Sequence, residues 1–519
     1  MLGHDDGRAG GAVTADDERR RPAARIATGR LLGRWETGTA VFLGIPFAEP
    51  PVGDQRFAPP HRVPGWTGTR DASAFGPPPP QGGHFGMDAR SQDGDDWLTI
   101  NVWSPDPSPD AGLPVMVWVQ GGAYVIGMSS LPEYDGSRLA RGGGVVVVTF
   151  NYRVGVEGFA QIQGAPANRG LLDQVAALEW VRDNIRSFGG DPGRVTVFGQ
   201  SAGGGSVAAL LAMDRASGLF QRAIVQSMPG TFFSVELAAD IAAACAAELG
   251  TRRTVADLAE VDPRQLSAAA DTVGATMDQR VHRWGRPAHR LIPFSPVIDG
   301  DVLAVTPWQA LTEGAGAAVD LVVGHTRDEQ RLFNAVNGLL GEVSEEQAAV
   351  ALAVLAPGAD GDRRYREAFP SAGPEELYEL VHSDWLFRMP SLQLAETQAA
   401  KGGRVHVYEL SWPAPGMGGI FGACHGLDVP LVFGNLDRGQ PAMLIGDPPS
   451  PEASALSARM LSAWVSFADG GDPGWPPYDT DRRLVQQLDT EPVVVADPEQ
   501  RSRLIWRDHD FAALPLVGG

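Results

Sequence analysis

The segment Gly199-Gln200-Ser201-Ala202-Gly203 places a serine between two glycines in a GxSxG pattern. The apolar run Val195–Phe198 precedes it, and a small-residue stretch compatible with a helix, 204–211, follows it. A serine on such a strand-to-helix turn presents its hydroxyl at the carboxyl edge of a sheet, and the glycines let neighbouring backbones pass closely. The pattern is weak by itself, but this context indicates a nucleophile for acyl transfer.

A second segment upstream of the serine, Val117-Trp118-Val119-Gln120-Gly121-Gly122-Ala123-Tyr124, looks like a strand that ends in a glycine-rich loop. Folds with the serine turn place backbone N–H groups at such a loop, where they stabilise the negative charge that develops on a substrate oxygen. The alternative for this segment alone is an ordinary turn after a strand. Together, the two segments predict acyl-transfer chemistry.

A serine nucleophile needs a base and a carboxylate, which follow it in the order acid, then histidine, in this kind of fold. Asp328-Glu329 comes after the apolar run 319–323 and a turn, and either carboxylate could serve. The alternative is an acidic start of an ordinary helix. His425 lies in the loop Gly422-Ala423-Cys424-His425-Gly426, from which an imidazole could reach the serine, and is the candidate base.

Three other histidines also lie beyond the candidate acids. His406 falls in an apolar strand and is expected to be structural. His382 lies in a helical stretch and His509 in a polar tail, and both are expected to lie in solvent.

Six apolar runs predict the strands that position these residues: 115–119, 145–150, 195–198, 223–225, 319–323 and 405–410. Near-continuous apolar runs are typical of strands that are buried on both faces, as in a parallel sheet. Residues 171–188 repeat apolar positions with helical spacing and predict a crossover helix. Strands that alternate with helices define the α/β class. We expect a disordered tail over 1–25 and one domain over 26–519, with helical insertions near 236–290 and 340–400 that form a cap.

The composition disfavours several classes of function. The chain has 519 residues, with 42 Lys+Arg against 63 Asp+Glu and a formal net charge of −21, which disfavours binding to nucleic acid. No apolar run approaches the ~20 residues of a membrane helix. Its two cysteines, Cys245 and Cys424, are too few for a framework of disulfides, and no Cys/His cluster indicates zinc. The acyl-transfer chemistry that the serine turn predicts implies neither a metal nor an organic cofactor. We expect a cytoplasmic protein.

With these motifs in order, the sequence resembles the type-B carboxylesterases of the α/β-hydrolase fold, the family of cholinesterases and bacterial para-nitrobenzyl esterases. The resemblance runs from about Thr28 to about Trp506. It rests on many segments that agree in order: FLGIPFAEPPVGDQRFAPP (42–60), DDWLTINVW (95–103), NYRVGVEGF (151–159), NRGLLDQVAALEWVRDNIRSFGGDPGRVTVFGQSAGG (168–204), PFSPVIDG (293–300), GHTRDEQRLF (324–333) and HGLDVPLVFGN (425–435).

The resemblance implies a triad of Ser201 as nucleophile, His425 as general base and acid, and Glu329 as the orienting carboxylate. It selects Glu329 over Asp328, which the residues alone leave open. It also implies a large, mostly parallel sheet with helical cap insertions. The remaining site residues that it implies are the backbone N–H groups of an oxyanion hole, from Gly122, Ala123 and Ala202, and a serine that supports the acid, Ser227.

Several positions depart from the family pattern. Gln120 and Ala123 replace a histidine and a glycine in the oxyanion loop, and both retain the backbone N–H groups that the hole needs. Gln200 replaces a glutamate, which removes a negative charge beside His425. Gln330 replaces a glycine after the acid. Pro79 and Trp97 stand where the family has the cysteines of its first disulfide, as expected in a reducing compartment.

The resemblance implies hydrolysis of small to medium apolar esters through an acyl-enzyme. An amidase, carbamate hydrolase or thioesterase could use the same residues, and a non-catalytic binding member of the fold is the alternative from another class. The pockets should be apolar. Residues expected to line them are Tyr124, Phe294, Met417 and Phe421, for each of which a place in the core is the alternative.

Overall fold

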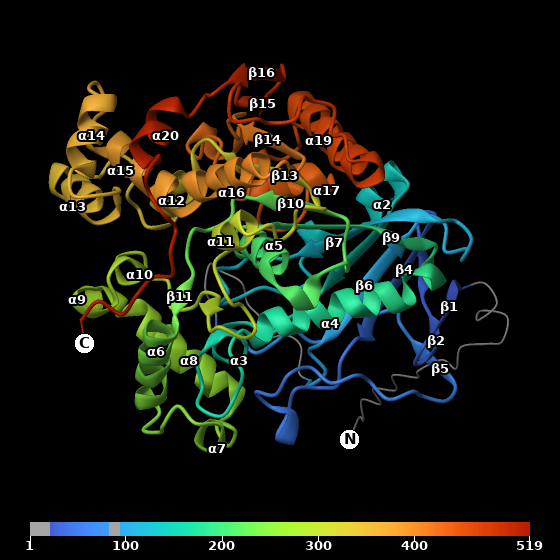
Figure 1. Cartoon of the computed structure of the whole chain (residues 1–519). Coiled ribbons are helices and arrows are strands. Elements are labelled where there is room, and N and C mark those ends of the chain that lie inside the picture. Colours follow the sequence, from blue (N-terminus) through green and yellow to red (C-terminus); the bar gives the residue numbers. More distant parts are fainter. Residues whose placement is uncertain (1–20, 83–93, 519) are drawn as a thin grey trace, which may run out of the picture.

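An eleven-stranded sheet forms the centre of the computed structural model, which describes residues 21–82 and 94–518 (Figure 1). Its seven central strands are parallel, and antiparallel strands close both edges. The strands in spatial order are β16 (Val493–Ala496), β15 (Leu484–Leu488), β14 (Val405–Leu410), β13 (Asp320–Thr326), β10 (Arg222–Gln226), β9 (Gly190–Gln200), β7 (Leu113–Val119), β8 (Val146–Phe150), β6 (Thr99–Ser104), β4 (Thr39–Pro46) and β3 (Arg34–Glu36).

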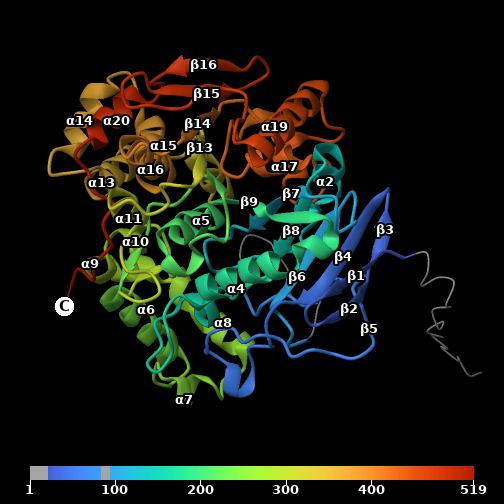
Figure 2. The ribbon, with the colours of Figure 1, turned by 45° about the vertical axis from the view of Figure 1, so that its right-hand side comes forward.

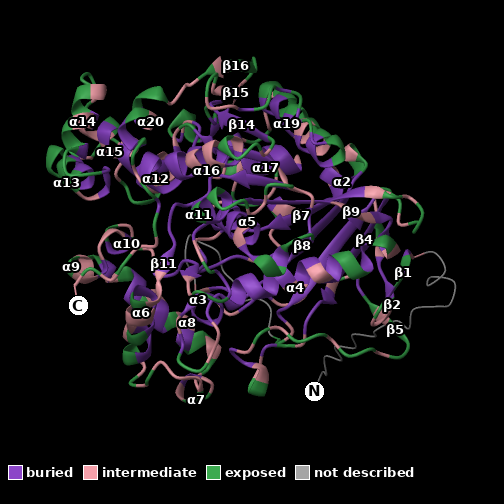
Figure 3. Cartoon of the chain, viewed as in Figure 1, coloured by how far each residue is buried: buried purple, intermediate pink, exposed green. Residues whose placement is uncertain are grey.

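Helices cover both faces of the sheet, and the side chains of β7 pack against the helices on both of these faces. Val115, Val117 and Val119 pack into one hydrophobic core, whereas Met116 and Trp118 pack into another on the opposite face. Because successive side chains of a strand alternate between faces, a run of five apolar residues fills two cores at once. Figure 3 shows these central strands buried and the exposed residues concentrated on outer helices.

The first core is covered by α3 (Gly155–Phe159), α4 (Arg169–Asn184), α5 (Ala202–Ala212), α11 (Pro307–Thr312) and α16 (Met389–Ala400). The second is covered by α2 (Ser137–Gly143), α17 (Asp428–Phe433), α18 (Ala442–Ile445) and α19 (Pro451–Gly470). Two further helices complete this part, α12 (Glu329–Val336) and α20 (Gln500–Trp506). The expected crossover helix 171–188 is α4, which a short 3₁₀ turn, Ile185–Phe188, extends.

Two helical segments leave the sheet where insertions were expected, and they lie on the same side of the molecule (Figure 1, left). The first holds α6 (Val235–Glu248), α7 (Val255–Leu258), α8 (Pro263–Ala275), α9 (Val281–Trp284) and α10 (Arg286–His289). The second holds α13 (Glu345–Leu355), α14 (Gly361–Ala368) and α15 (Pro374–Ser383). The last part of the second expected range is α16, which packs on β13 and β14 and therefore belongs to the layer that covers the sheet.

A strand forms earlier in the chain than the sequence suggested. Residues 1–20 of the expected tail lie outside the described residues, but β1 (Ala23–Ile26) starts within the last part of that range. It pairs with β2 (Gly29–Leu32), which pairs with β5 (Thr69–Asp71), in a small sheet beside β4 (Figure 2). Ala24 and Ile26 are buried there, so alternate apolar residues hold a strand within a polar stretch. A two-stranded sheet, β11 (Phe233–Ser234) with β12 (Val297–Ile298), completes the fold.

Candidate active site

The candidate nucleophile lies on a tight turn between β9 and α5. Ser201 has φ 58° and ψ −127°. Residues other than glycine rarely adopt this backbone conformation, which costs about 1–3 kcal/mol. The turn is held by the Ser201 N–H, which donates to Gln226 O at 2.9 Å. A Cβ on Gly203 would lie 2.0 Å from Val119 O, and one on Gly199 would lie 2.6 Å from the Gly203 backbone. The glycines of the motif are therefore required by close approach of three backbone segments.

His425 lies against Glu329, and both side chains are buried. His425 Nδ1 is 2.5 Å from Glu329 Oε2, and Glu329 Oε1 accepts the Thr326 N–H at 2.9 Å. The carboxylate can only accept, so it fixes the imidazole tautomer with the proton on Nδ1 and a lone pair on Nε2. A neutral histidine held in this way can act as a general base.

The carboxyl group of Glu329 remains ionised in spite of its burial. Burial acts to raise its pKa, but the charge of His425, hydrogen bonds from His425 and the Thr326 N–H, and the nearby Ser227 hydroxyl outweigh it and lower the pKa below its usual range. Ser227 lies beside this carboxylate on a backbone with φ 48°, and its N–H donates to Gly324 O at 2.8 Å. The buried Ser227 hydroxyl makes no hydrogen bond of standard geometry among the described residues, and its role as a support of the acid stays a prediction.

Asp328, the other carboxylate that the residues alone left open, holds the histidine loop. Its Oδ2 accepts the Ala423 N–H at 2.8 Å, and its own N–H donates to Ala423 O at 2.9 Å. A Cβ on Gly422, which has φ 57°, would lie 2.4 Å from Asp328 Oδ2. The two neighbouring acids thus have different tasks: Asp328 fixes the backbone before His425, and Glu329 contacts the imidazole.

Gln200 contacts the imidazole from the other side. Its Nε2 lies 3.1 Å from His425 Nε2, and the glutamine side chain is buried. Among the described contacts, Ser201 Oγ makes no hydrogen bond with His425. The position before the serine is therefore a direct neighbour of the candidate base.

Two aromatic rings that sequence reasoning missed also hold the imidazole. Phe387 stacks on His425 with ring centroids 4.2 Å apart, and Phe333 lies at 5.4 Å. Phe333 follows Glu329 by one turn of α12, which is a signal that could have identified it. Phe387 comes from a π-helical turn, Asp384–Arg388, which is remote from His425 in the chain, and no sequence pattern indicates it.

The expected oxyanion loop lies against the serine turn. A Cβ on Gly121 would lie 2.8 Å from Gln200 O and 3.2 Å from Ser201 Cβ. The loop turns through Gly122, Ala123 and Tyr124, which have φ of 118°, 54° and 61°. Within the described part of the chain, the N–H groups of Gly122, Ala123 and Ala202 donate to no other group. They are free to bind an oxyanion.

The residues expected to line the pockets divide into two groups. Tyr124, Phe294 and Phe421 are buried in the two hydrophobic cores, and Tyr124 packs on Phe159 with centroids 4.8 Å apart. Met417 lies in a short turn, Gly416–Gly419, with 62% of its surface exposed. Their part in substrate binding stays a prediction.

The three other candidate histidines have different partners. His406 Nδ1 lies 2.9 Å from Trp475 O within β14, as expected of a structural residue. The expectation that His382 lies in solvent is wrong. It is buried at the end of α15, with Nδ1 2.7 Å from Tyr378 O, and burial and the charge of Arg290 hold its pKa well below the usual value. His509 is half-buried against Trp506 and Phe511.

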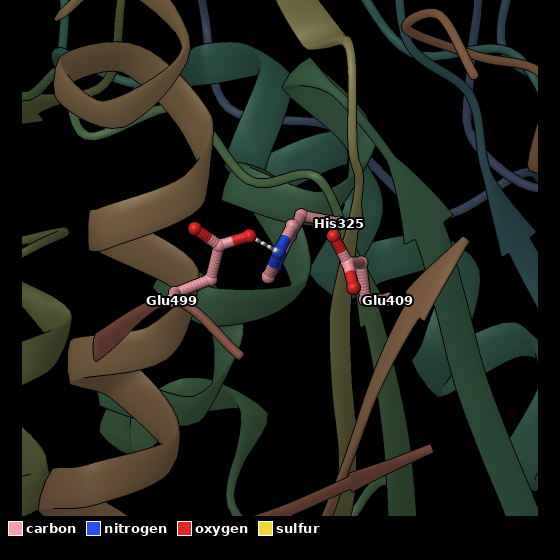
Figure 4. Close-up of side chains that lie close together, drawn as sticks. All are labelled: His325, Glu409 and Glu499. Atoms are coloured by element: carbon pink, nitrogen blue, oxygen red, sulfur yellow. Dashed lines mark ion pairs between the residues drawn. The ribbon is translucent and has the colours of Figure 1, made fainter. Parts of the chain in front are cut away.

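A buried ionic cluster lies behind the acid, at the end of β13. Figure 4 shows His325 between Glu409 and Glu499, with one donor atom of each within 4.8 Å of the others. Such a group could hold a metal ion, but two guanidinium groups already pair with its carboxylates: Arg327 with Glu409 at 3.1 Å and Arg388 with Glu499 at 3.4 Å. We therefore interpret it as an ionic anchor. His325 precedes Thr326, whose N–H donates to Glu329, so the cluster lies next to the strand end that contacts this carboxylate.

The cluster makes a prediction about stability. Burial acts to raise the pKa of Glu499, but the charges of Arg388 and His325 outweigh it and lower that pKa. Glu499→Gln should therefore lower the free energy of unfolding by about 1–2 kcal/mol at pH 7, because Arg388 loses one buried partner and keeps Asp384, which lies 2.8 Å away. A carboxylate with a lowered pKa contributes stability above its ordinary value of 4.5, and the contribution is lost as pH falls below it. The difference between the proteins should shrink below that pH.

Urea unfolding at pH 7 and pH 3 measures both effects, because the contribution of Glu499 is lost as pH falls from 4.5 towards about 2. Glu367→Gln is the matched control, because the Arg363–Glu367 pair is exposed and should contribute less than about 1 kcal/mol. Equal losses in the two variants, or a Glu499→Gln loss that does not depend on pH, would contradict the ionic anchor.

A serine on a strand-to-helix turn at the carboxyl end of a mostly parallel sheet, followed along the chain by an acid and then by a histidine that contacts this acid, defines the α/β-hydrolase class. A family model described as the carboxylesterase family matches residues 20–506. The chain belongs to the carboxylesterase family, and it is a carboxylesterase.

Known relatives agree over nearly the whole chain. The para-nitrobenzyl esterase of Bacillus subtilis (strain 168) is 37% identical over 92% of this chain and 96% of its own length. The phenmedipham hydrolase of Pseudarthrobacter oxydans is 34% identical over 92% and 97%. A carboxylesterase of Geobacillus stearothermophilus of known structure superposes with a TM-score of 0.82, at 34% identity, over 94% of this chain and 100% of that one. Over the described residues, the helices are all too short or too polar to span a membrane.

Proposed function

We propose that this carboxylesterase is a serine hydrolase that acts through an acyl-enzyme on small to medium apolar esters. The observation that carries the proposal is the buried His425–Glu329 pair, which meets the Ser201 turn through Gln200. Ser201, Glu329 and His425 are the proposed triad, and the N–H groups of Gly122, Ala123 and Ala202 the proposed oxyanion hole.

In the proposed reaction, Ser201 Oγ attacks the ester carbonyl while His425 Nε2 takes its proton. Glu329 stabilises the imidazolium through Nδ1, and the free N–H groups bind the carbonyl oxygen as it becomes negative. The imidazolium returns the proton to the alcohol, which leaves. His425 then activates a water molecule that attacks the acyl-enzyme, and the acid is released from Ser201. Side chains, backbone N–H groups and water supply every group in this scheme.

The substrate class rests on the relatives' names and on the family. The relatives include a para-nitrobenzyl esterase, a phenmedipham hydrolase and a fumonisin B1 esterase. Amide, carbamate and thioester bonds are alternatives for the same triad. A non-catalytic binding member of the fold would be expected to lack the serine or the histidine, and both are present here.

The deciding experiment is an assay with a series of para-nitrophenyl esters of increasing acyl length, together with matched amide, carbamate and thioester substrates. We expect turnover to be highest on short to medium apolar esters. Covalent labelling with a fluorophosphonate should place the label on the peptide that contains Ser201. Absence of both turnover and labelling in folded protein would support the binding alternative.

We further propose a cytoplasmic location without a nucleic-acid or membrane partner. The support is that both cysteines are free, together with the excess of acidic residues. Cys245 and Cys424 are buried in different parts of the fold, and burial raises the pKa of each thiol to about 12, so both should be unreactive in the folded protein.

Alkylation followed by mass spectrometry of unreduced protein tests this. Neither thiol should be modified in the native protein, and both should be modified under denaturing conditions. A disulfide between Cys245 and Cys424 in freshly purified protein would contradict the prediction and the proposed compartment.

A further inference from the structure

The Gln200 amide contacts the ring nitrogen of His425 that faces away from Glu329. Because Glu329 accepts the proton of Nδ1, Nε2 of the neutral ring carries a lone pair and no hydrogen. An amide 3.1 Å from this nitrogen can form a hydrogen bond only by donating its own N–H. The chemistry of the pair thus assigns both the tautomer of His425 and the orientation of the amide.

We propose that Gln200 caps the lone pair of His425 Nε2 in the resting enzyme and competes with the Ser201 hydroxyl for it. This inference rests on the proposed role of His425 as the base. The nitrogen has a single lone pair, so it cannot accept full hydrogen bonds from both residues. The absence of a Ser201–His425 hydrogen bond among the described contacts agrees with an occupied lone pair.

The fold holds the cap in place. Gln200 is the last residue of β9 and pairs in register with Gln226 of β10, whose carbonyl also accepts the Ser201 N–H. The amide packs beneath the oxyanion loop, where a Cβ on Gly121 would lie 3.3 Å from its Oε1. Gln200 is only 7% exposed, so water competes weakly for its amide.

An amide and a carboxylate differ at this position in a defined way. A glutamate could not donate to the neutral ring, and its charge would favour the imidazolium. The glutamine has the opposite effect on both counts: it donates to the neutral ring, and it carries no charge. It therefore holds His425 in the neutral form and delays its engagement with Ser201, whereas a glutamate would do neither.

The cap predicts two effects of Gln200→Met, which keeps the length of the side chain and removes the donor. At high pH, where His425 is neutral, kcat/KM should rise about three- to tenfold, the effect of one hydrogen bond of ordinary net strength. The acidic limb of the pH profile should move to higher pH by about half a unit to one unit, because a proton no longer competes with the amide for the lone pair of His425 Nε2. Gln200→Glu should move this limb further in the same direction.

The experiment records kcat/KM against pH for the wild type and both variants on one un-ionised para-nitrophenyl ester, with active sites counted by burst titration. Gln330→Met is the matched control. Gln330 is also a buried glutamine, next to the proposed triad acid, but its amide contacts Asn334 and Arg290. Its profile should match that of the wild type.

An NMR titration of His425 in a Ser201→Ala background tests the cap without turnover. The midpoint should be lowest with Gln200 in place, higher after Gln200→Met and highest after Gln200→Glu. In the kinetic profile of Gln200→Met, a lowered plateau of kcat/KM at high pH with an unmoved acidic limb would overturn the cap. The amide would then have a supporting role. Wild-type turnover that does not depend on Ser201 would instead refute the proposed function, and the order of the NMR midpoints would still decide the cap.

Discussion

Ser201→Ala should abolish ester turnover and leave the fold intact. Loss of a serine nucleophile costs on the order of 10⁶-fold in kcat, because the remaining groups can only bind and polarise the ester. The substitution should not harm stability, since alanine keeps the backbone of the turn and the Ser201 N–H still donates to Gln226 O. The measurement is kcat on a short para-nitrophenyl ester, with folding checked by circular dichroism and thermal unfolding.

Ser206→Ala is the matched control for this substitution. Ser206 lies further along α5 and is buried, and its hydroxyl accepts a hydrogen bond from Gln174 at 3.0 Å. We expect its kcat per folded molecule to remain close to that of the wild type. A folded Ser201→Ala variant with a tenth of wild-type kcat would refute Ser201 as nucleophile.

His425→Ala should be nearly as severe, with a loss of kcat on the order of 10⁵- to 10⁶-fold. Among the described residues, no other base both contacts Glu329 and reaches the serine turn, so none can replace the imidazole. Its removal also leaves the buried Glu329 carboxylate without its main partner, and some loss of stability should accompany the loss of activity. Activity is therefore compared per folded molecule.

His406→Ala and His382→Ala are the controls, because both histidines are buried and hydrogen-bonded to a carbonyl oxygen. Each should lose stability with little change in kcat. A collapse of kcat in folded His406→Ala comparable with that of His425→Ala would show that the base has been assigned wrongly.

Much of the fold follows from local patterns in the sequence. The apolar runs predicted strands β7, β8, β9, β10, β13 and β14, because a strand buried on both faces needs an unbroken apolar run. The glycines around Ser201 predicted the turn, because the close approach of Val119 leaves no room for a Cβ. Both features depend on residues adjacent in the chain.

Sequence patterns alone did not show which of Asp328 and Glu329 contacts the imidazole. The resemblance implied Glu329, whereas composition and spacing allowed either acid. In the structure α12 begins at Glu329, so the two side chains leave the backbone in different directions. One reaches the imidazole and the other the Ala423 N–H.

The sequence by itself determined the α/β class, the order of strands and helices and the position of the serine turn, because periodicity and close approach are encoded locally. Only the tertiary structure decided that His382 is buried, that Phe387 stacks on His425, that Gln200 contacts its ring and that His325 lies between Glu409 and Glu499. Each of these features depends on residues that are far apart in the chain. Their burial and pairing follow from how the helices and strand ends meet, which no local pattern specifies.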